Sequence, residues 1–168
     1  MTKKQELMKS LIRVGGELLL ICMFLVLIDL PSTLSYLSQR NRAKESEAKI
    51  YVGSMNRAQQ ALFIEKSAFA TSVNALGIGI KTETTNYKYS VRATKQTAFN
   101  YGVCKKPELK SYVGGAFVIR VKSNNGEDEM RTESILCSTD TPGTIPHLPP
   151  KLQNGKLVCE TGTTQVTK

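Results

Sequence analysis

Four cysteines and one histidine are the residues of this 168-residue chain best suited to nucleophilic, acid–base or metal chemistry. His147 lies between prolines in Pro146-His147-Leu148-Pro149, with no nucleophile or carboxylate pattern around it. No CxxC spacing or cysteine–histidine cluster is present, so neither a zinc site nor a thioredoxin-like motif is indicated. The sequence therefore predicts no catalytic residue, no metal site and no cofactor. The four cysteines are Cys22, Cys104, Cys137 and Cys159.

The cysteines suit structural chemistry instead. Cys22 lies in an apolar segment and is most simply a small apolar residue. Three cysteines remain, enough for one bridge and one odd thiol. A bridge between Cys137 and Cys159 would restrain the proline-rich loop between them by roughly 3 kcal/mol. Two alternatives stay open: all three cysteines are reduced, or Cys104 pairs with one of the others.

An apolar segment near the N-terminus predicts a membrane anchor. Leu18–Ile28 is uninterrupted, and Val14–Leu30 gives 17 residues broken by Glu17 and Asp29. A bilayer-spanning helix needs about 20 residues, so a signal peptide is the alternative. The exit of this segment lacks the small-residue cleavage site of a signal peptide, and Leu34, Tyr36 and Leu37 continue its apolar character. We expect a retained transmembrane helix at residues 14–37.

Flanking charge predicts the orientation of this anchor. Residues 1–13, the predicted leader, carry four basic residues against one acidic residue, which favours a cytoplasmic N-terminus. The sequence thus predicts a single-pass protein of the inner (plasma) membrane. Its head, residues 38–168, lies on the extracytoplasmic side, where disulfides are permitted.

The head begins with a predicted amphipathic helix over residues 41–66. This segment lacks proline, and its apolar residues recur every three or four positions along one helical face. Glu45 and Lys49 form an i,i+4 pair in the favourable order. Such a helix needs a cover, and a sheet formed by the following residues is the natural one. The apolar face comprises Ala48, Tyr51, Val52, Met55, Ala58 and Leu62.

Four antiparallel strands are predicted after this helix. In Tyr87–Ala93 the residues alternate, so that Tyr87 and Tyr89 face one side while Lys88 and Arg92 face the other. The remaining strands are expected at Ala98–Cys104, Ala116–Val121 and Arg131–Cys137, with a turn at residues 123–126 and a last short strand at Lys156–Cys159. Residues 71–77 are expected to form one capped turn. The predicted fold class is α+β, a long N-terminal helix packed on a four-stranded antiparallel sheet.

The formal net charge of +9 is spread along the chain. Scattered basic residues are typical of a solvated surface, although a basic head can also contact phosphate or anionic polysaccharide. The only local pattern suited to nucleic acid is Lys88, Arg92 and Lys95 near Tyr87 and Tyr89. Nucleic acid is therefore an unfavoured but open partner.

Five segments of the head resemble the type IV pilin-like (G/H) family of cyanobacterial type. They are residues 46–60 (SEAKIYVGSMNRAQQ), 69–72 (FATS), 76–79 (LGIG), 82–89 (TETTNYKY) and 109–115 (LKSYVGG). The resemblance extends over residues 44–137. It implies an N-terminal helix half in the membrane, a four-stranded sheet and a C-terminal disulfide loop. It also implies partners: other pilin or pseudopilin subunits, the inner-membrane assembly machinery and the lipid bilayer.

The leader departs from the pattern of that family. Members have Gly before the cleavage point, Phe after it and Glu at the fifth mature position. The family's spacing places that Glu at Glu17, but Ile12 and Arg13 then flank the cut. If Gly15 or Gly16 is placed before the cut, the fifth mature position is Leu20 or Ile21 and no longer Glu. The family's helix proline is also displaced, here to Pro31. The prepilin leader is thus degenerate.

Glu17 is the subunit-docking candidate that the resemblance implies. In the family its carboxylate pairs with the new N-terminal ammonium of a neighbouring subunit, because a charge buried in apolar packing needs a partner. Without cleavage, Glu17 is either neutral or paired with Arg13 four residues earlier. The alternative is a Glu17 exposed to lipid headgroups.

The sequence favours a non-enzymatic pilus or pseudopilus subunit, a minor or specialised one given the altered leader. A non-polymerising, membrane-tethered binding module with the same head is the alternative. Pili and type II secretion systems share this subunit plan, so the sequence does not name the machine.

Overall fold

The computed structural model describes residues 3–122, 128–143 and 148–166, with side chains from residue 35 onward. Helix α1 spans Lys3–Lys66. The chain divides into two compact units, residues 1–40 and residues 41–168. In the first unit every described residue is helical.

Among the described residues, no helical segment is both long and apolar enough to cross a bilayer.

The predicted transmembrane segment, residues 14–37, falls mostly on residues whose side chains lie outside the described set. The side chains of Arg13, Glu17 and Cys22 also lie outside it. The anchor and the role of Glu17 therefore stay predictions.

The second unit contains the rest of α1, a short 3-10 helix and seven strands. Five strands form one antiparallel sheet in the order β1-β2-β3-β4-β7, while β5 and β6 form a separate hairpin. The bounds are η1 (Asn74–Leu76), β1 (Tyr87–Ala93), β2 (Thr97–Cys104), β3 (Tyr112–Lys122), β4 (Asp128–Thr139), β5 (Lys151–Gln153), β6 (Lys156–Val158) and β7 (Thr163–Gln165).

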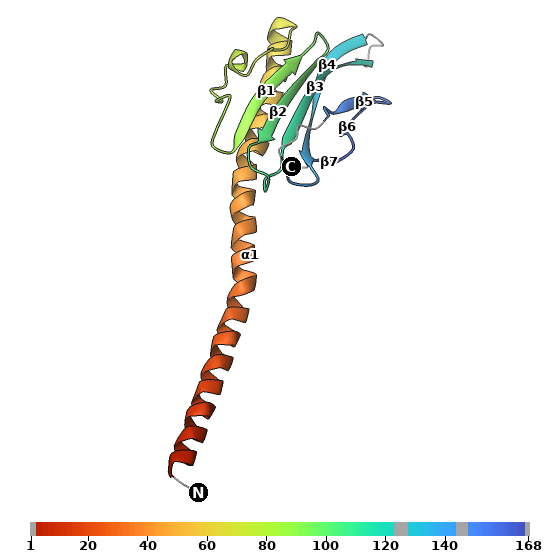
Figure 1. Cartoon of the computed structure of the whole chain (residues 1–168). Helices are drawn as coiled ribbons and strands as arrows, with labels where there is room; N and C mark the ends of the chain where they lie inside the picture. The colour runs from red at the N-terminus through yellow and green to blue at the C-terminus, as the bar shows by residue number, and fades with distance from the viewer. Residues whose placement is uncertain (1–2, 123–127, 144–147, 167–168) are drawn as a thin grey trace. The chain divides into compact units, whose positions relative to one another are not determined.

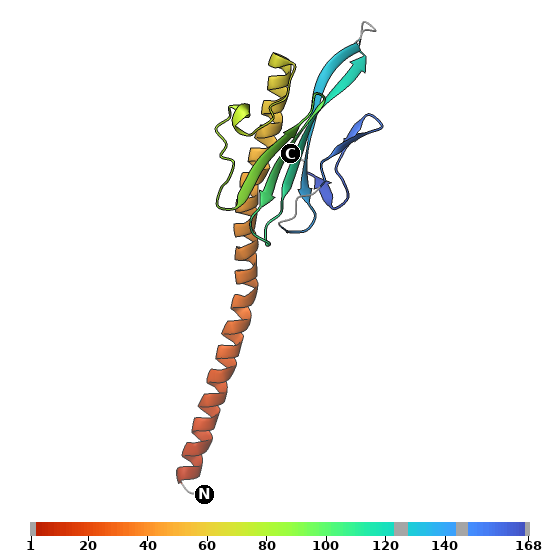
Figure 2. The ribbon, with the colours of Figure 1, turned by 45° about the horizontal axis from the view of Figure 1, so that its top comes forward.

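Within this unit the sheet is the middle one of three layers. The C-terminal part of α1 lies along one face, and the β5–β6 hairpin lies over the other (Figure 1). The turned view shows the same three layers (Figure 2). The predicted α+β class, with one long helix against an antiparallel sheet, is confirmed.

The apolar face of α1 forms the first core, as its periodicity predicts. Ala48, Val52 and Met55 are fully buried, while Tyr51, Ala58 and Leu62 pack against them partly buried. Tyr87 and Tyr89 of β1 meet this face of α1, since alternate residues of a strand share one side of the sheet. The neighbouring Lys88 and Ser90 are exposed, which confirms the alternation predicted for this strand.

The predicted number of strands is wrong, because the main sheet has five strands and not four. The missed strand is β7, three residues of sequence TTQ that pair with the end of β4. A segment of three polar residues is too short to show the apolar–polar alternation that predicts a strand. The expected last strand at Lys156–Cys159 corresponds to β6, which pairs with β5 and not with the main sheet.

Strand β3 begins at Tyr112, four residues before the predicted start at Ala116. Gly114 and Gly115 suggested a break, because glycine weakens an isolated strand. Both glycines lie inside β3, where other side chains occupy the space that a Cβ would fill. Asn56 lies over Gly114, and Phe117 and Pro150 lie over Gly115. Here glycine marks close approach to the sheet from both faces.

The turn predicted at residues 71–77 is present as η1. Gly77 closes it with φ at 68°, a left-handed conformation that favours glycine. The turn predicted at residues 123–126 lies outside the described residues.

Candidate interaction surfaces

Two carboxylates of α1 fix the loops at the start of the head. Glu47 Oε1 accepts hydrogen bonds from Thr84 Oγ1 at 2.7 Å and from the Tyr89 hydroxyl at 3.0 Å. Glu45 Oε1 accepts one from the Lys110 backbone N–H at 2.9 Å. Both acids thus bind segments distant in sequence, which the i,i+4 pattern of Glu45 does not predict.

The tyrosines around these carboxylates are held in their protonated form. Burial, and after it the charge of Glu45, raises the pKa of Tyr112 to about 12. Burial, followed by the hydrogen bond to Glu47, raises the pKa of Tyr89 above its ordinary value. These hydroxyls therefore remain hydrogen-bond donors at neutral pH and are poor acid–base catalysts.

A buried amide network joins α1 to the sheet. Asn100 of β2 donates from Nδ2 to Asn56 Oδ1 at 2.8 Å, and Asn56 donates to the Ile135 carbonyl at 2.9 Å. Gln59 accepts from the Ala70 N–H at 2.8 Å and donates to the Ala70 carbonyl at 3.0 Å. A side-chain hydrogen bond of 3.4 Å links Gln59 to Asn100. This network ties α1, the loop after it and two strands into one unit.

An exposed apolar hollow lies between α1 and the loop after η1. Its volume is about 540 Å³, and it is lined mainly by apolar side chains of α1 and of the loop after η1. Ile50 on its rim is 58% exposed. We call this surface the isoleucine patch; its lining residues are Ile50, Tyr51, Ser54, Arg57, Ala58, Ala61, Ile78 and Ile80.

The opposite face of the sheet carries a second apolar surface, which we call the outer groove. It has a volume of about 530 Å³ between the β2–β3 edge of the outer face and the residues around β5. Phe99 and Phe117 form its floor in an edge-to-face arrangement, and Leu148 and Leu152 are exposed beside them. Such rings and aliphatic side chains suit an apolar polypeptide surface better than a polar substrate.

A disulfide and an ion pair hold the C-terminal segment on the outer face of the sheet. Cys137 of β4 is bonded to Cys159. The ion pair joins Lys151 Nζ to Glu160 Oε1 at 2.7 Å, and its hydrogen bond holds the pKa of Glu160 below the ordinary value. The C-terminal segment is therefore held to the sheet partly by a covalent bond.

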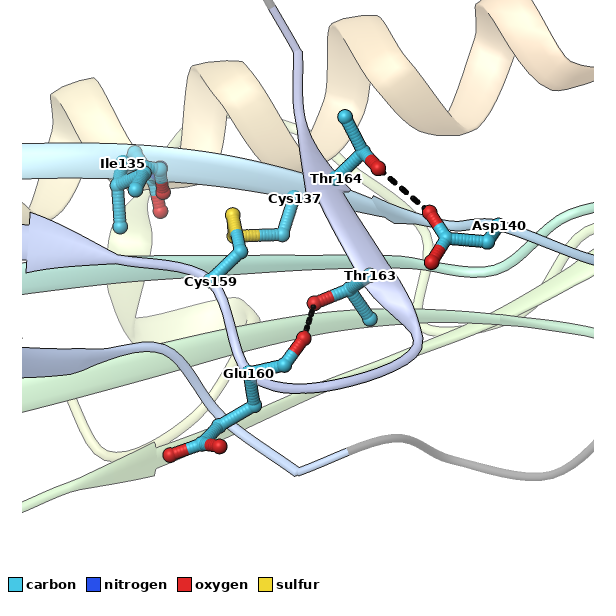
Figure 3. The surroundings of a disulfide bond; sticks show 8 residues. Ile135, Cys137, Asp140, Cys159, Glu160, Thr163 and Thr164 are labelled. Atoms are coloured by element: carbon cyan, nitrogen blue, oxygen red, sulfur yellow. Dashed lines mark hydrogen bonds between the residues drawn. A yellow bond between two sulfur atoms is a disulfide. The ribbon is translucent and has the colours of Figure 1, made fainter.

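Side-chain hydrogen bonds position β7 beside the disulfide (Figure 3). Thr163 Oγ1 donates to the Glu160 carbonyl, and Thr164 Oγ1 donates to Asp140 Oδ1, both at 2.6 Å. The predicted Cys137–Cys159 pair is present.

Cys104 does not take part in this disulfide. It is free and buried, and its Sγ donates to the Gly143 carbonyl at 2.7 Å. The two alternatives left open by the sequence, three reduced cysteines or a bridge to Cys104, are therefore wrong.

The pattern proposed for nucleic acid divides between the two faces of the sheet. Tyr87 and Tyr89 are buried against α1, whereas Lys88 and Arg92 lie on exposed positions of the same strand. Arg92 lies 5.8 Å from the centre of the Tyr101 ring, a partner that the sequence pattern did not include. Tyr87 and Tyr89 are thus not available for stacking beside these basic groups, and this expectation is corrected.

The described residues do not form a metal site. No group of three histidine, cysteine or acidic side chains is positioned there to hold a metal ion. His147 lies outside the described residues. What the described part of the chain offers is two apolar surfaces on opposite faces of a cross-linked head.

Comparison with protein families matches residues 45–160 to the type IV pilin-like G and H family. No curated protein and no solved structure matches the chain.

Proposed function

Because this chain belongs to the type IV pilin-like G and H family, we propose that it is a non-enzymatic subunit of a type IV pilus or pseudopilus. It is a minor or specialised subunit of cyanobacterial type, held in the inner membrane by residues 14–37. Its partners are other pilin or pseudopilin subunits and the inner-membrane machinery that assembles them.

One observation carries this proposal: the family match covers most of the head that the structure describes. Within residues 45–160 lie the apolar face of α1, the buried amide network, strands β1 to β6 and both disulfide cysteines. These features make a rigid head with exposed apolar surfaces on two faces, as a subunit that packs against neighbours requires.

The minor or specialised role is supported by the leader. Ile12 and Arg13 stand where the family has Gly and Phe, so the chain lacks the family's residues at the cut that creates the N-terminal ammonium next to Glu17. If residues 1–12 stay attached, Glu17 is paired with Arg13 or neutral, and docking loses its electrostatic attraction. A subunit of this kind joins a filament less readily than a major pilin does.

Mass spectrometry of the mature protein tests the state of the leader. Removal of a leader supports a polymerising subunit with the usual ammonium. An intact N-terminus, combined with absence from filaments, favours the alternative of a membrane-tethered binding module that does not polymerise.

A western blot of the membrane and sheared-filament fractions tests Glu17 itself. We expect the full-length chain in both fractions and Glu17→Ala depleted from the filament fraction only. Glu65→Ala, an exposed carboxylate of the second unit, is the matched control and should distribute as the unchanged chain does. Equal incorporation of both variants would remove Glu17 from the docking mechanism.

A further inference from the structure

Strand β4 has one side that is only partly covered by another strand. On its first side it pairs with β3 from Asp128 to Ser138. On its second side β7 pairs only with Cys137–Thr139, and the Val166 N–H donates to the Leu136 carbonyl at 2.8 Å. In the described part of the chain, no strand pairs with this side of β4 between residues 128 and 135. We call this segment the open edge of β4.

The register decides which backbone groups the open edge presents. In an antiparallel ladder, alternate residues direct both their N–H and their C=O to the same side. The Leu136 carbonyl points to the β7 side, since it accepts from Val166. Ser134, Thr132 and Met130 therefore present their backbone groups at the open edge. A row of this kind is a template for strand addition.

A side chain of α1 occupies the middle of this row. Gln60 donates from Nε2 to the Thr132 carbonyl at 3.0 Å. Its Oε1 accepts a hydrogen bond from Ser134 Oγ at 3.1 Å. The carboxamide thus takes the acceptor that an added strand would need, while it engages the neighbouring edge residue as well.

The exposed charges of β4 determine which strand fits this edge. Arg131 and Glu133 are exposed and lie on the same face, because they are two residues apart. If two copies pair antiparallel about Thr132, each Arg131 faces the Glu133 of the other copy. The pairing then gains two opposite-charge contacts, and the two Thr132 residues exchange their N–H···O=C bonds.

From this geometry we propose that the open edge of β4 is a self-pairing surface for a second copy of the chain, centred on Thr132, and that Gln60 controls access to it. The result is a two-fold dimer in which the sheets of both copies join edge to edge. Gln60 must leave Thr132 before the pair forms, so the unmodified chain is mostly monomeric. This inference does not rest on the proposed filament role, since dimerisation requires no assembly machinery.

Sedimentation of the full-length chain in detergent micelles tests the control by Gln60. Gln60→Ala removes the competing hydrogen bonds from both copies and should strengthen dimerisation roughly tenfold or more. Gln60→Met keeps the length of the side chain without the donor and should have the same effect. Glu65→Ala on the same helix should leave dimerisation unchanged. Urea unfolding of each variant verifies that the fold is retained.

Charge exchange tests the register. Adding Arg131→Glu to Gln60→Ala places acidic residues opposite Glu133 twice and should return dimerisation to the level of the unchanged chain. Adding Glu133→Arg as well restores opposite charges and should restore the dimer. Amide hydrogen exchange at Thr132 should be slowed in the dimer only.

The proposal is overturned if Gln60→Ala and Gln60→Met leave dimerisation unchanged. It is also overturned if the double exchange of Arg131 and Glu133 fails to restore the dimer, or if all variants dimerise equally. Each of these results leaves the filament proposal intact, because that proposal is tested by the mature N-terminus and the filament fraction.

Discussion

The two faces of the sheet are covered in different ways. On the inner face α1 contributes an apolar stripe and the amide network of Asn56, Gln59 and Asn100. On the outer face the cover consists of strands three residues long, with Leu157 and Cys159 packed against Phe117 and Ile135. The outer face also has the disulfide, whereas the inner face is held by packing and hydrogen bonds.

This difference shows what each cover can supply. A long helix buries a continuous stripe and can position amides above the sheet, so it specifies its own register. Short strands bury little apolar surface, and a covalent bond compensates by limiting the freedom of the unfolded C-terminal segment. The inner face therefore defines the fold, and the outer face is an attached layer whose stability depends on the disulfide.

The strongest test of the inner face is Gly114→Ala. A Cβ at this position would lie 2.2 Å from Asn56 Oδ1 and 2.8 Å from its Cγ, so the amide network must move. We expect a loss of about 3 kcal/mol in the free energy of unfolding, measured with urea.

Gly53→Ala is the matched control for that substitution. The nearest atom to its Cβ is Leu136 Cδ2 at 3.9 Å, an ordinary contact. Because alanine favours a helix over glycine, stability should rise by about 1 kcal/mol. Equal losses at both positions would contradict the close approach of Asn56 to the sheet.

Removal of the disulfide tests the outer face. The double variant Cys137→Ala/Cys159→Ala releases a loop with a sequence separation of 22. The free energy of unfolding should fall by about 3 kcal/mol. Cys104→Ala is the control that leaves the bridge in place. A double variant as stable as the unchanged chain would show that the outer cover does not need its bond.

Gln59→Leu sharpens the role of the amide network on the inner face. The variant leaves the N–H and C=O of Ala70 without their partner, and it removes the contact to Asn100. We expect a loss of about 2 kcal/mol, since buried backbone groups left unpaired are costly. Faster amide exchange at Ala70 should accompany that loss, and its absence would argue against the network as the tie between α1 and the following loop.

The smallest expected effect concerns the pKa of Glu160. Its hydrogen bond with Lys151 holds this pKa below the ordinary value of a glutamate, so Lys151→Ala should raise it in an NMR titration. A carboxyl group whose pKa is lowered by folding stabilises the folded state at pH values above its pKa in the unfolded chain. This contribution is lost as the pH falls through its pKa in the folded state. An unchanged pKa of Glu160 in Lys151→Ala would show that this ion pair does not help to hold the outer cover.

The sequence predicted the inner face well, because its signals are long and periodic. The apolar residues from Ala48 to Leu62 show one helical face, and Tyr87–Ala93 shows an alternation that matches the bounds of β1. The disulfide pair was also among the predicted alternatives. The helix and the strand each follow from a pattern within one segment.

The remaining features depend on contacts between distant residues. Nothing near Gly114 indicates that Asn56 fills the space above it, so β3 was predicted too short. Strand β7 has only three polar residues, and its pairing is decided by β4 and the nearby disulfide. The hydrogen bond from Gln60 to the Thr132 carbonyl likewise joins residues 72 positions apart. Such features require the fold before they can be recognised.

The central claim, an inner face that defines the fold and an outer layer held by a bond, is tested most directly by amide hydrogen exchange with and without reductant. We predict that reduction speeds exchange in β5, β6 and β7, while residues 48–62 of α1 and strands β1 and β2 keep their protection. If reduction opens both sets of residues to the same extent, the two faces form one cooperative unit, and the account is contradicted.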